Sequence, residues 1–339
     1  MSIYSEKEKE NSERKAIVSS LSNLSPVVKN FSTKFKKIII FAFIIWGLFA
    51  FGLGSLISWF FIAKVTLDKF PEITANDRIL VVAPHIDDEI ISAGGLIQKA
   101  KSVGAQVKVV YLTNGDNNIY SIIGENKNLK INPGEFIKLG EQRMNEARAA
   151  TQILGLKEED LYFLGYPDGG LSLMLNKFYT TPYTSRGTKF NYNPYEKTYK
   201  KEQLYTGANV VSDLEEIISG FNPTIIIVPH PRDQHPDHWA TFQFIEKALK
   251  EKKFQTKIFA YLVHYKAYPP EHKLKMDEFL YPPKKLFSQK GWVSFNLTQD
   301  QENKKLEAMN QNKTQLKFSK VNDLIQSFVK RNEIFEEIE

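Results

Sequence analysis

Residues 78–99, RILVVAPHIDDEIISAGGLIQK, decide the fold of this chain. The branched apolar run after Arg78 predicts a buried strand, which must end at Pro84 because proline cannot continue a ladder of hydrogen bonds. From about Asp88 the apolar residues recur at helical spacing, and acidic side chains open the helix where its dipole favours negative charge. The stretch therefore predicts one strand followed directly by one helix.

The turn between this strand and this helix carries one imidazole and three carboxylates. Ligand sites in open α/β sheets form just beyond the carboxyl ends of the strands. Acidic groups crowded into such a crevice repel one another and resist desolvation unless a cation is present. The sequence therefore predicts a metal at this turn, whose polar residues are His85, Asp87, Asp88 and Glu89.

The rest of the chain continues to alternate apolar strands with helices. This alternation predicts an α/β fold with a Rossmann-like, doubly wound and mainly parallel sheet. Residues 178–205 interrupt the rhythm as a loop insertion, for which a substrate loop and a plain insertion are equal alternatives. Residues 292–339 are expected to form C-terminal helices that cap the sheet. The expected strands span 106–112, 161–164, 224–228 and 258–264, and the expected helices span 133–155, 210–218 and 239–252.

The composition limits the class of protein. A chain of 339 residues, 42% of them hydrophobic, can bury a large core. It has no cysteine, which excludes disulfides and thiolate metal sites, so imidazoles and carboxylates must hold any metal. The net charge is +6, but residues 1–37 hold eight basic and four acidic residues, which leaves the remainder at about +2. The basic balance is therefore no evidence for a nucleic-acid partner.

Residues 38–63 are predicted to form one transmembrane helix. The segment carries no charge and is long enough to cross a bilayer with some tilt. Lysines are more numerous before it than after it, so the positive-inside rule favours a single-pass membrane protein with its N-terminus inside and its large domain outside the cytoplasm. The predicted organisation is a flexible basic segment at 1–37, the membrane helix, a linker at 64–75 and one domain at 76–339.

A second polar cluster, HPRDQHPDH at residues 230–238, follows the strand expected at 224–228 and contains three of the six histidines. A lone histidine is more often a satisfied surface or core residue than a ligand. Two such clusters at strand ends of one sheet are hard to explain as packing, because buried charges without partners are costly. Catalytic zinc sites commonly use three protein ligands and leave one position for water. The two clusters can supply these ligands as His85, Asp88 and His238.

The two clusters together resemble the signatures of the PIG-L/LmbE-like de-N-acetylase family, zinc hydrolases that remove acetyl groups from N-acetylglucosamine-containing conjugates. The first signature is similar to PHIDDE at residues 84–89, and the second to HPDH at residues 235–238. Further similar stretches are TNGD at 113–116 and LGYPDG at 164–169. The likeness extends over residues 76–248 and more faintly to the C-terminus.

This resemblance implies how a metal is held. Zinc, with ferrous iron as the alternative, would be bound by His85, Asp88 and His238, and Asp87 would act as general base. Glu89 has the alternative role of accepting a backbone N–H at the start of the helix.

The resemblance also implies residues that act on the substrate. His235 would assist at the tetrahedral intermediate, with Asp237 orienting or tuning it. Arg143 and Asp168 match positions that contact sugar hydroxyls, against the alternatives of a surface ion pair and a turn residue. One position departs from the family pattern: Ile86 stands where proline, which would fix the local backbone, is usual.

These features predict a membrane-anchored, zinc-dependent hydrolase that removes the acetyl group from an N-acetylamino sugar, and the anchor favours a lipid-linked or envelope conjugate as substrate. The enzymatic alternative is a deacetylase of a soluble glucosaminide in low-molecular-weight thiol biosynthesis. A non-catalytic glycan-binding module is a second alternative, although such a relative would be expected to have lost Asp87 or a metal ligand. Hydrolysis of another bond, such as a phosphoester, is disfavoured because two-metal sites need more bridging carboxylates.

Overall fold

The computed structural model divides the chain into two units, Met1–Thr66 and Leu67–Glu339. The predicted membrane helix at 38–63 and the predicted flexible segment at 1–37 fall mostly outside the described residues, although residues 11–17 are helical and exposed. Within the described residues, no helix combines the length and the hydropathy needed to cross a bilayer. The described residues are 67–125, 131–250, 256–287 and 291–338 in the second unit, and 11–17, 19, 41 and 44–47 in the first.

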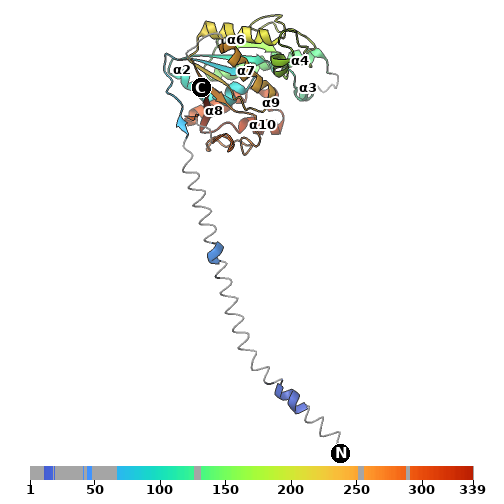
Figure 1. Cartoon of the computed structure of the whole chain (residues 1–339), viewed down its shortest axis with the longest axis vertical. Helices are drawn as coiled ribbons and strands as arrows, with labels where there is room; N and C mark the ends of the chain where they lie inside the picture. Colours follow the sequence, from blue (N-terminus) through green and yellow to red (C-terminus); the bar gives the residue numbers. More distant parts are fainter. Residues whose placement is uncertain are drawn as a thin grey trace, which may run out of the picture. The chain divides into compact units, whose positions relative to one another are not determined.

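The second unit is built on an eight-stranded sheet with the order β1-β7-β8-β6-β5-β2-β3-β4. Figure 1 shows this unit with its helices labelled around the sheet. All neighbouring strands run parallel except β8, which is antiparallel to both β6 and β7. The predicted mainly parallel α/β sheet is therefore confirmed. The strands are β1 (Asp68–Lys69), β2 (Arg78–Ala83), β3 (Gln106–Thr113), β4 (Leu161–Tyr166), β5 (Ile225–Pro229), β6 (Lys257–Tyr261), β7 (Trp292–Asn296) and β8 (Asn332–Ile338).

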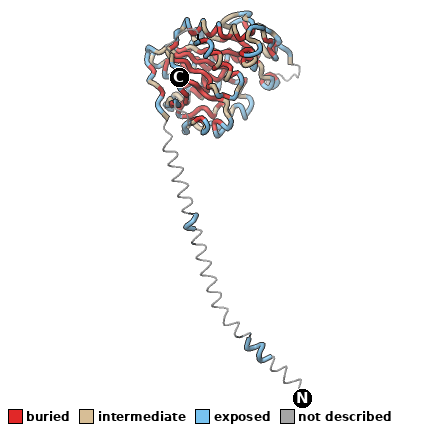
Figure 2. The backbone as a smooth tube through the Cα atoms, in the orientation of Figure 1, coloured by how far each residue is buried: buried red, intermediate tan, exposed pale blue. Residues whose placement is uncertain are grey.

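Helices cover both faces of the sheet, because successive side chains of a buried strand point to opposite faces. In β2, Ile79 and Val81 join a core with side chains of α2, α4 and α8, whereas Leu80 and Val82 join a core with α6 and α7. Figure 2 shows the buried backbone of this unit, in red, at its centre and the exposed segments, in pale blue, around it. The helices are α2 (Asp88–Ser102), α3 (Ile119–Glu125), α4 (Pro133–Ile153), the 3-10 helix η1 (Glu158–Asp160), α5 (Leu171–Asn176), α6 (Gly207–Phe221), α7 (Pro236–Lys250), α8 (Gln299–Met309), α9 (Lys313–Leu316) and α10 (Ser319–Gln326).

The order of the strands places the two polar clusters together. Strand β2 lies between β3 and β5, so the chain leaves β2 toward one edge and later returns to its other side. The crevice at such a switch point is the usual ligand site of an open α/β sheet. The first cluster follows β2 and the second follows β5, as the sequence predicts.

Two predicted boundaries need correction. The linker predicted at 64–75 is part of the folded domain from Leu67 onward, because β1 pairs with β7 and Phe70 is buried in the core. The tail predicted as helices at 292–339 also supplies strands β7 and β8, which complete one side of the sheet. Strand β8, NEIFEEI, was missed because glutamate is depleted in strands and three of its seven residues are glutamate.

The loop insertion at 178–205 packs against the domain. Tyr183, Tyr195 and Tyr205 are buried, and an isolated bridge joins Tyr192 to Leu204. The Tyr195 hydroxyl donates a 2.7 Å hydrogen bond to Asp116, so the insertion contacts the polar turn that follows β3.

Candidate active site

The turn from β2 into α2 holds the first cluster in a strained conformation. Asp87, the residue before the helix, has a φ of 113°, which is rare for a residue other than glycine. The Glu89 carboxylate accepts the Asp87 backbone N–H at 3.0 Å, and Asp88 accepts the His85 backbone N–H at 3.0 Å. Glu89 therefore binds backbone at the helix start, the alternative role that the sequence left open. Strain of this kind, on the order of 1–3 kcal/mol, is typical of functional sites.

The turn from β5 into α7 is organised by Asp233. Its carboxylate accepts backbone N–H groups of His235, Val263 and His264 at 2.9–3.0 Å. One oxygen of the same carboxylate also lies 3.3 Å from Nδ1 of His238. Asp233 therefore fixes the loop and faces the outer nitrogen of the imidazole predicted to bind metal, as carboxylates near metal-bound histidines commonly do.

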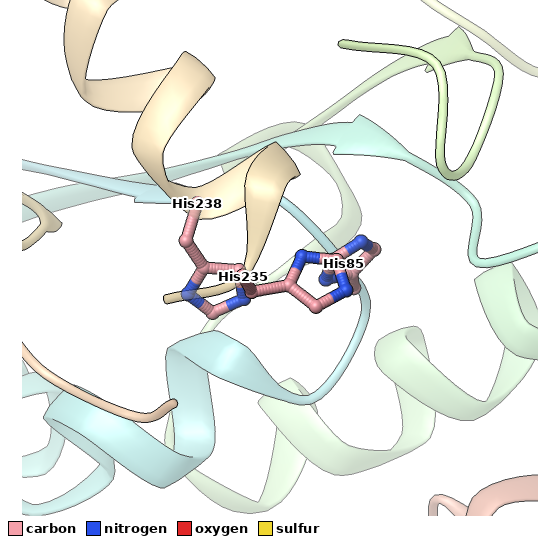
Figure 3. Close-up of side chains that lie close together, drawn as sticks. All are labelled: His85, His235 and His238. Atoms are coloured by element: carbon pink, nitrogen blue, oxygen red, sulfur yellow. The ribbon is translucent and has the colours of Figure 1, made fainter. Parts of the chain in front are cut away.

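Asp88 contacts both of the histidines that are predicted to bind metal with it. Asp88 Oδ2 lies 3.4 Å from Nδ1 of His85 and 3.2 Å from Nε2 of His238. Bonds of about 2.0–2.1 Å to a tetrahedral zinc would place neighbouring ligand atoms about 3.3–3.4 Å apart. His235 also belongs to the cluster, because ring nitrogens of His85, His235 and His238 lie within 4.8 Å of one another (Figure 3).

The His238 side chain supports a metal at this point. Its imidazole is fully buried, yet within the described part of the chain neither ring nitrogen has a hydrogen-bond partner of normal geometry. A buried polar atom without a partner is costly, whereas a nitrogen bound to metal is satisfied. The donor set of imidazoles and carboxylates also suits zinc. A second group that could hold a cation combines His85 with Asp168 and Asp237.

Burial and neighbouring charges separate the pKa values of these groups. Burial lowers the pKa of His238, but the carboxylates of Asp88 and Asp233 outweigh it and raise that pKa to about 10. Burial opposes ionisation of Asp88, but the two histidines beside it hold its pKa well below the usual range. Burial and the charges of Asp88 and Glu89 raise the pKa of Asp87 well above the usual range. Burial, followed by the charges of neighbouring histidines, lowers the pKa of His235 to about 4.

Asp237 contacts a different histidine from the one expected. Its carboxylate lies 3.3 Å from Nε2 of His85 and accepts the backbone N–H groups of Gly169 and Leu171 at 2.7 and 3.1 Å. Only its backbone N–H reaches His235, at 3.3 Å from Nδ1. Asp237 therefore joins the second cluster to the loop after β4.

Arg143 lies in the site and not on the surface. Its guanidinium is buried and donates to the carbonyl of Gly115 at 2.7 Å and to the hydroxyl of Ser121 at 3.2 Å. Gly115 has a φ of 65°, and a Cβ at this position would collide with the guanidinium. Nε of Arg143 has no hydrogen-bond partner among the described residues, which leaves a donor available.

Asp168 faces the same centre from the loop after β4. One oxygen lies 3.4 Å from Nε2 of His85, and the other accepts the backbone N–H of Asn117 at 3.1 Å. Burial raises the pKa of Asp168, but His85 outweighs this and lowers it to about 2. Asp168 is thus more than a turn residue.

A cavity of about 220 Å³ opens over these groups. His85, Asp87, Asp88, Arg143, Asp168 and His235 line it, whereas Asp237 and His238 are fully buried. Part of the remaining wall comes from α9 and α10, which contribute Gln315 and Leu324. The C-terminal helices therefore shape the site as well as cap the sheet.

His264 is a site residue that the sequence analysis missed. Its ring centroid lies 4.7 Å from that of His238 and 5.0 Å from that of His235, and it lines the cavity. Burial and the charge of His238 lower its pKa to about 3. The signal was present, because His264 ended a predicted strand of the same sheet. Strand β6 ends at Tyr261, so His264 lies beyond the carboxyl end of its strand, like the two clusters.

Fold and site together define an α/β protein with a candidate metal centre at the switch point of its sheet. The chain belongs to the PIG-L family, described as GlcNAc-PI de-N-acetylase, which matches residues 80–249. This confirms the resemblance inferred from the paired motifs.

The chain is similar to a curated deacetylase and to several solved structures, most of them named as deacetylases and one as a hydratase. The 1D-myo-inositol 2-acetamido-2-deoxy-alpha-D-glucopyranoside deacetylase of Corynebacterium glutamicum is 27% identical over 179 residues, covering 52% of this chain and 54% of that protein. The chain therefore spans about half the length of this relative. Among solved structures, an N,N'-diacetylchitobiose deacetylase from Pyrococcus horikoshii matches with a TM-score of 0.49 and 17% identity, over 77% of this chain and 84% of that one. A zinc-inhibited form of teicoplanin deacetylase matches with a TM-score of 0.46 and 18% identity, over 70% and 85%.

Proposed function

We propose that this chain is a metal-dependent hydrolase that removes the acetyl group from an N-acetylglucosamine-type sugar. The observation that carries the proposal is the convergence of two polar clusters, from separate strand ends, on one point beside the cavity. Asp88 Oδ2 lies within 3.4 Å of both His85 and His238, and ring nitrogens of His85, His235 and His238 lie within 4.8 Å of one another. Membership in the PIG-L family supports the amide of an acetylated amino sugar as the bond that is broken.

His85, Asp88 and His238 are the residues that would hold the ion, with zinc or ferrous iron as candidates. Asp233 would hold the outer nitrogen of His238, from which it lies 3.3 Å. When bound, such an ion polarises a carbonyl and lowers the pKa of a coordinated water toward about 7.

Asp87 is suited to accept a proton from the attacking water. It lines the cavity, lies in the turn between His85 and Asp88, and is held in place by the Glu89 carboxylate through its backbone N–H. Burial and the charges of Asp88 and Glu89 raise its pKa, which makes it a stronger base than an exposed aspartate.

His235 is suited to stabilise the oxyanion that develops on the acetyl carbonyl. Its Nδ1 accepts the backbone N–H of Asp237 at 3.3 Å, so the neutral ring carries its proton on Nε2. Burial and the charges of nearby histidines lower its pKa to about 4, which keeps the ring neutral. A fixed N–H donor in a site shielded from water stabilises developing negative charge.

Arg143 and Asp168 are suited to bind the hydroxyl groups of the sugar. Both are charged, both line the cavity, and both are held by backbone contacts on one side. A guanidinium and a carboxylate facing the same small cavity can donate to one hydroxyl and accept from another.

The part of the substrate beyond this sugar separates two candidate functions. A lipid-linked sugar or envelope conjugate agrees with the charge-free segment at 38–63. A soluble glucosaminide agrees with the relative from C. glutamicum, whose name describes an inositol-linked acetamido sugar. A comparison of acetate release from the two classes of compound decides between them.

The location of the chain is a separate proposal. We infer a single-pass anchor at 38–63 with the catalytic domain outside the cytoplasm, from the lysines before that segment. Because the chain has no cysteine, one cysteine introduced by Lys273→Cys tests this directly. Labelling of intact cells by a membrane-impermeant maleimide is expected, and labelling only after lysis would contradict the orientation. Recovery of the full chain in the soluble fraction would contradict the anchor.

The deacetylation proposal is tested with three variants of the full chain, assayed for bound metal and for acetate release from N-acetylglucosaminides. Asp87→Asn should retain the metal and lose most of its turnover, whereas Asp88→Asn should lose the metal as well. Asp300→Asn is a matched control, because Asp300 is exposed and pairs with Lys304 on α8. A wild-type chain that binds metal and releases no acetate would favour the non-catalytic alternative. A wild-type chain that retains no metal would contradict the proposal.

A further inference from the structure

A second and larger cleft lies outside the catalytic cavity. It has a volume of about 810 Å³ and is formed mainly by residues 265–271 and 278–285, with Gln234 and Lys330 at its sides. This connection between β6 and β7 lies beyond residues 80–249, which match the family. The cleft is thus a feature of this chain that the family match does not account for.

A third hollow of about 300 Å³ lies between the cleft and the catalytic cavity. That hollow shares His235, His264 and Leu324 with the catalytic cavity, and Tyr265 and Lys266 with the outer cleft. The catalytic cavity, at about 220 Å³, is smaller than the roughly 300–1,000 Å³ of a typical ligand site. A ligand larger than one sugar would therefore extend along this path.

The lining of the outer cleft combines aromatic faces with unneutralised lysines. Phe279 and Tyr281 line the cleft and are 43% and 45% exposed. Lys266, Lys284 and Lys285 are exposed there, and none of them forms an ion pair with another described residue.

The acidic residues of the cleft, by contrast, are already paired. Glu271 lies 2.6 Å from Lys275, and Glu278 lies 3.0 Å from both Lys275 and Lys330. The cleft therefore presents net positive charge beside exposed aromatic rings. This combination suits a ligand with an anionic group next to a planar or apolar group.

We propose that this cleft binds the diphosphate-bearing part of a larger substrate whose acetylated sugar occupies the catalytic cavity. The inference rests on the proposed function for the position of the sugar, but the cleft can be tested by binding alone. The lysines would contact the diphosphate, and Phe279 and Tyr281 would pack against the group beyond it. The group attached to the far side of the diphosphate is a nucleoside in nucleotide sugars and a prenyl chain in lipid-linked sugars.

The experiment compares four probes on the metal-loaded full chain: N-acetylglucosamine, triacetylchitotriose, UDP-N-acetylglucosamine and a short prenyl diphosphate N-acetylglucosamine. Binding is measured by calorimetry and turnover by acetate release. The test variants are Lys284→Gln with Lys285→Gln, and Tyr281→Ala. Lys273→Gln is the matched control, because Lys273 is an exposed lysine of the same segment outside the cleft.

Wild type is expected to bind at least one diphosphate conjugate on the order of tenfold more tightly than N-acetylglucosamine. The double lysine variant should lose this tighter binding of the conjugate and should bind N-acetylglucosamine as wild type does. The control variant should bind every probe as wild type does. Added salt should weaken binding of the conjugate, because exposed charges are screened. Tyr281→Ala should weaken whichever conjugate carries the group that packs there, which identifies the source.

Two results would overturn the inference. One is that wild type and the double lysine variant bind the diphosphate conjugates equally tightly. The other is that wild type binds the neutral triacetylchitotriose more tightly than either diphosphate conjugate. Measuring binding and acetate release separately distinguishes failure of the cleft proposal from failure of the deacetylase proposal. Absence of acetate release from every probe contradicts the catalytic proposal, while the calorimetric comparison still decides on the cleft.

Discussion

The buried ion pair between Lys305 and Glu333 should be a major determinant of stability. Helix α2 is interrupted at Ala93, so the first backbone N–H groups of its second part have no carbonyl partner within the helix. The Glu333 carboxylate accepts those of Gly95 and Leu96 at 2.7 and 2.9 Å. Lys305 pairs with this carboxylate at 2.7 Å, and the two side chains are 0% and 1% exposed.

Removing one member of this pair should leave the other buried without a counter-charge. Lys305→Met and Glu333→Gln preserve side-chain volume and should each lower the free energy of unfolding by about 3–5 kcal/mol. A typical domain has only about 5–15 kcal/mol in total, so either loss would be large. The double variant leaves no unpaired charge, and its loss should therefore be smaller than the sum of the two single losses.

Urea unfolding of the four chains, followed by circular dichroism, measures this coupling. Lys304→Met is the control, because Lys304 pairs with Asp300 at 3.0 Å on the exposed side of α8 and should change stability by no more than about 0.5 kcal/mol. Single losses below about 1 kcal/mol, or a double loss equal to their sum, would refute the reasoning.

Other substitutions test contacts around the site. Asp233→Asn should lower metal affinity by about 10–100-fold in chelator competition, because the carboxylate lies 3.3 Å from Nδ1 of His238 and would orient the ring, and unchanged affinity would contradict this role. Gly140→Ala should destabilise the domain by about 1–3 kcal/mol, since a Cβ there would collide with the buried Tyr195 hydroxyl, and an unchanged melting temperature would argue against it. Burial, with a neighbouring carboxylate, raises the pKa of Asp116 from 3.8 to about 7, so the folded state binds this proton more tightly than the unfolded state. Wild type should therefore lose unfolding free energy relative to Asp116→Asn as the pH rises from about 4 to 7, and a pH-independent difference would exclude this.

The central part of the sheet and the metal cluster were predictable because their signals are local. Strands β2 and β5 are short apolar runs buried on both faces, and each is followed at once by its polar residues. Parallel strands end at the same edge of a sheet, so the strand order alone brings such residues together. The meeting of the two polar clusters therefore required no knowledge of side-chain conformation, whereas the ligand set of His85, Asp88 and His238 stays a prediction.

The partners of those residues were harder to predict, because they depend on contacts between distant parts of the chain. Asp237 could not be assigned to His85 from its sequence neighbours, since the contact depends on the loop after β4 reaching the start of α7. His264 was hidden because the predicted strand ran three residues past its observed end at Tyr261. The ends of strands are hard to predict from sequence, and the wrongly placed end of β6 concealed His264 as a site residue.

The C-terminal region links the stability of the fold to the geometry of the site. Strand β8 supplies Glu333, which holds the interrupted helix α2, and that helix begins at Asp88 beside the strained Asp87. Backbone strain persists only where the surrounding structure enforces it. Loosening α2 through Glu333→Gln should therefore relax Asp87 and reduce turnover even at temperatures where the domain remains folded. A variant with reduced stability and full activity would show instead that the turn holds its own conformation through Glu89.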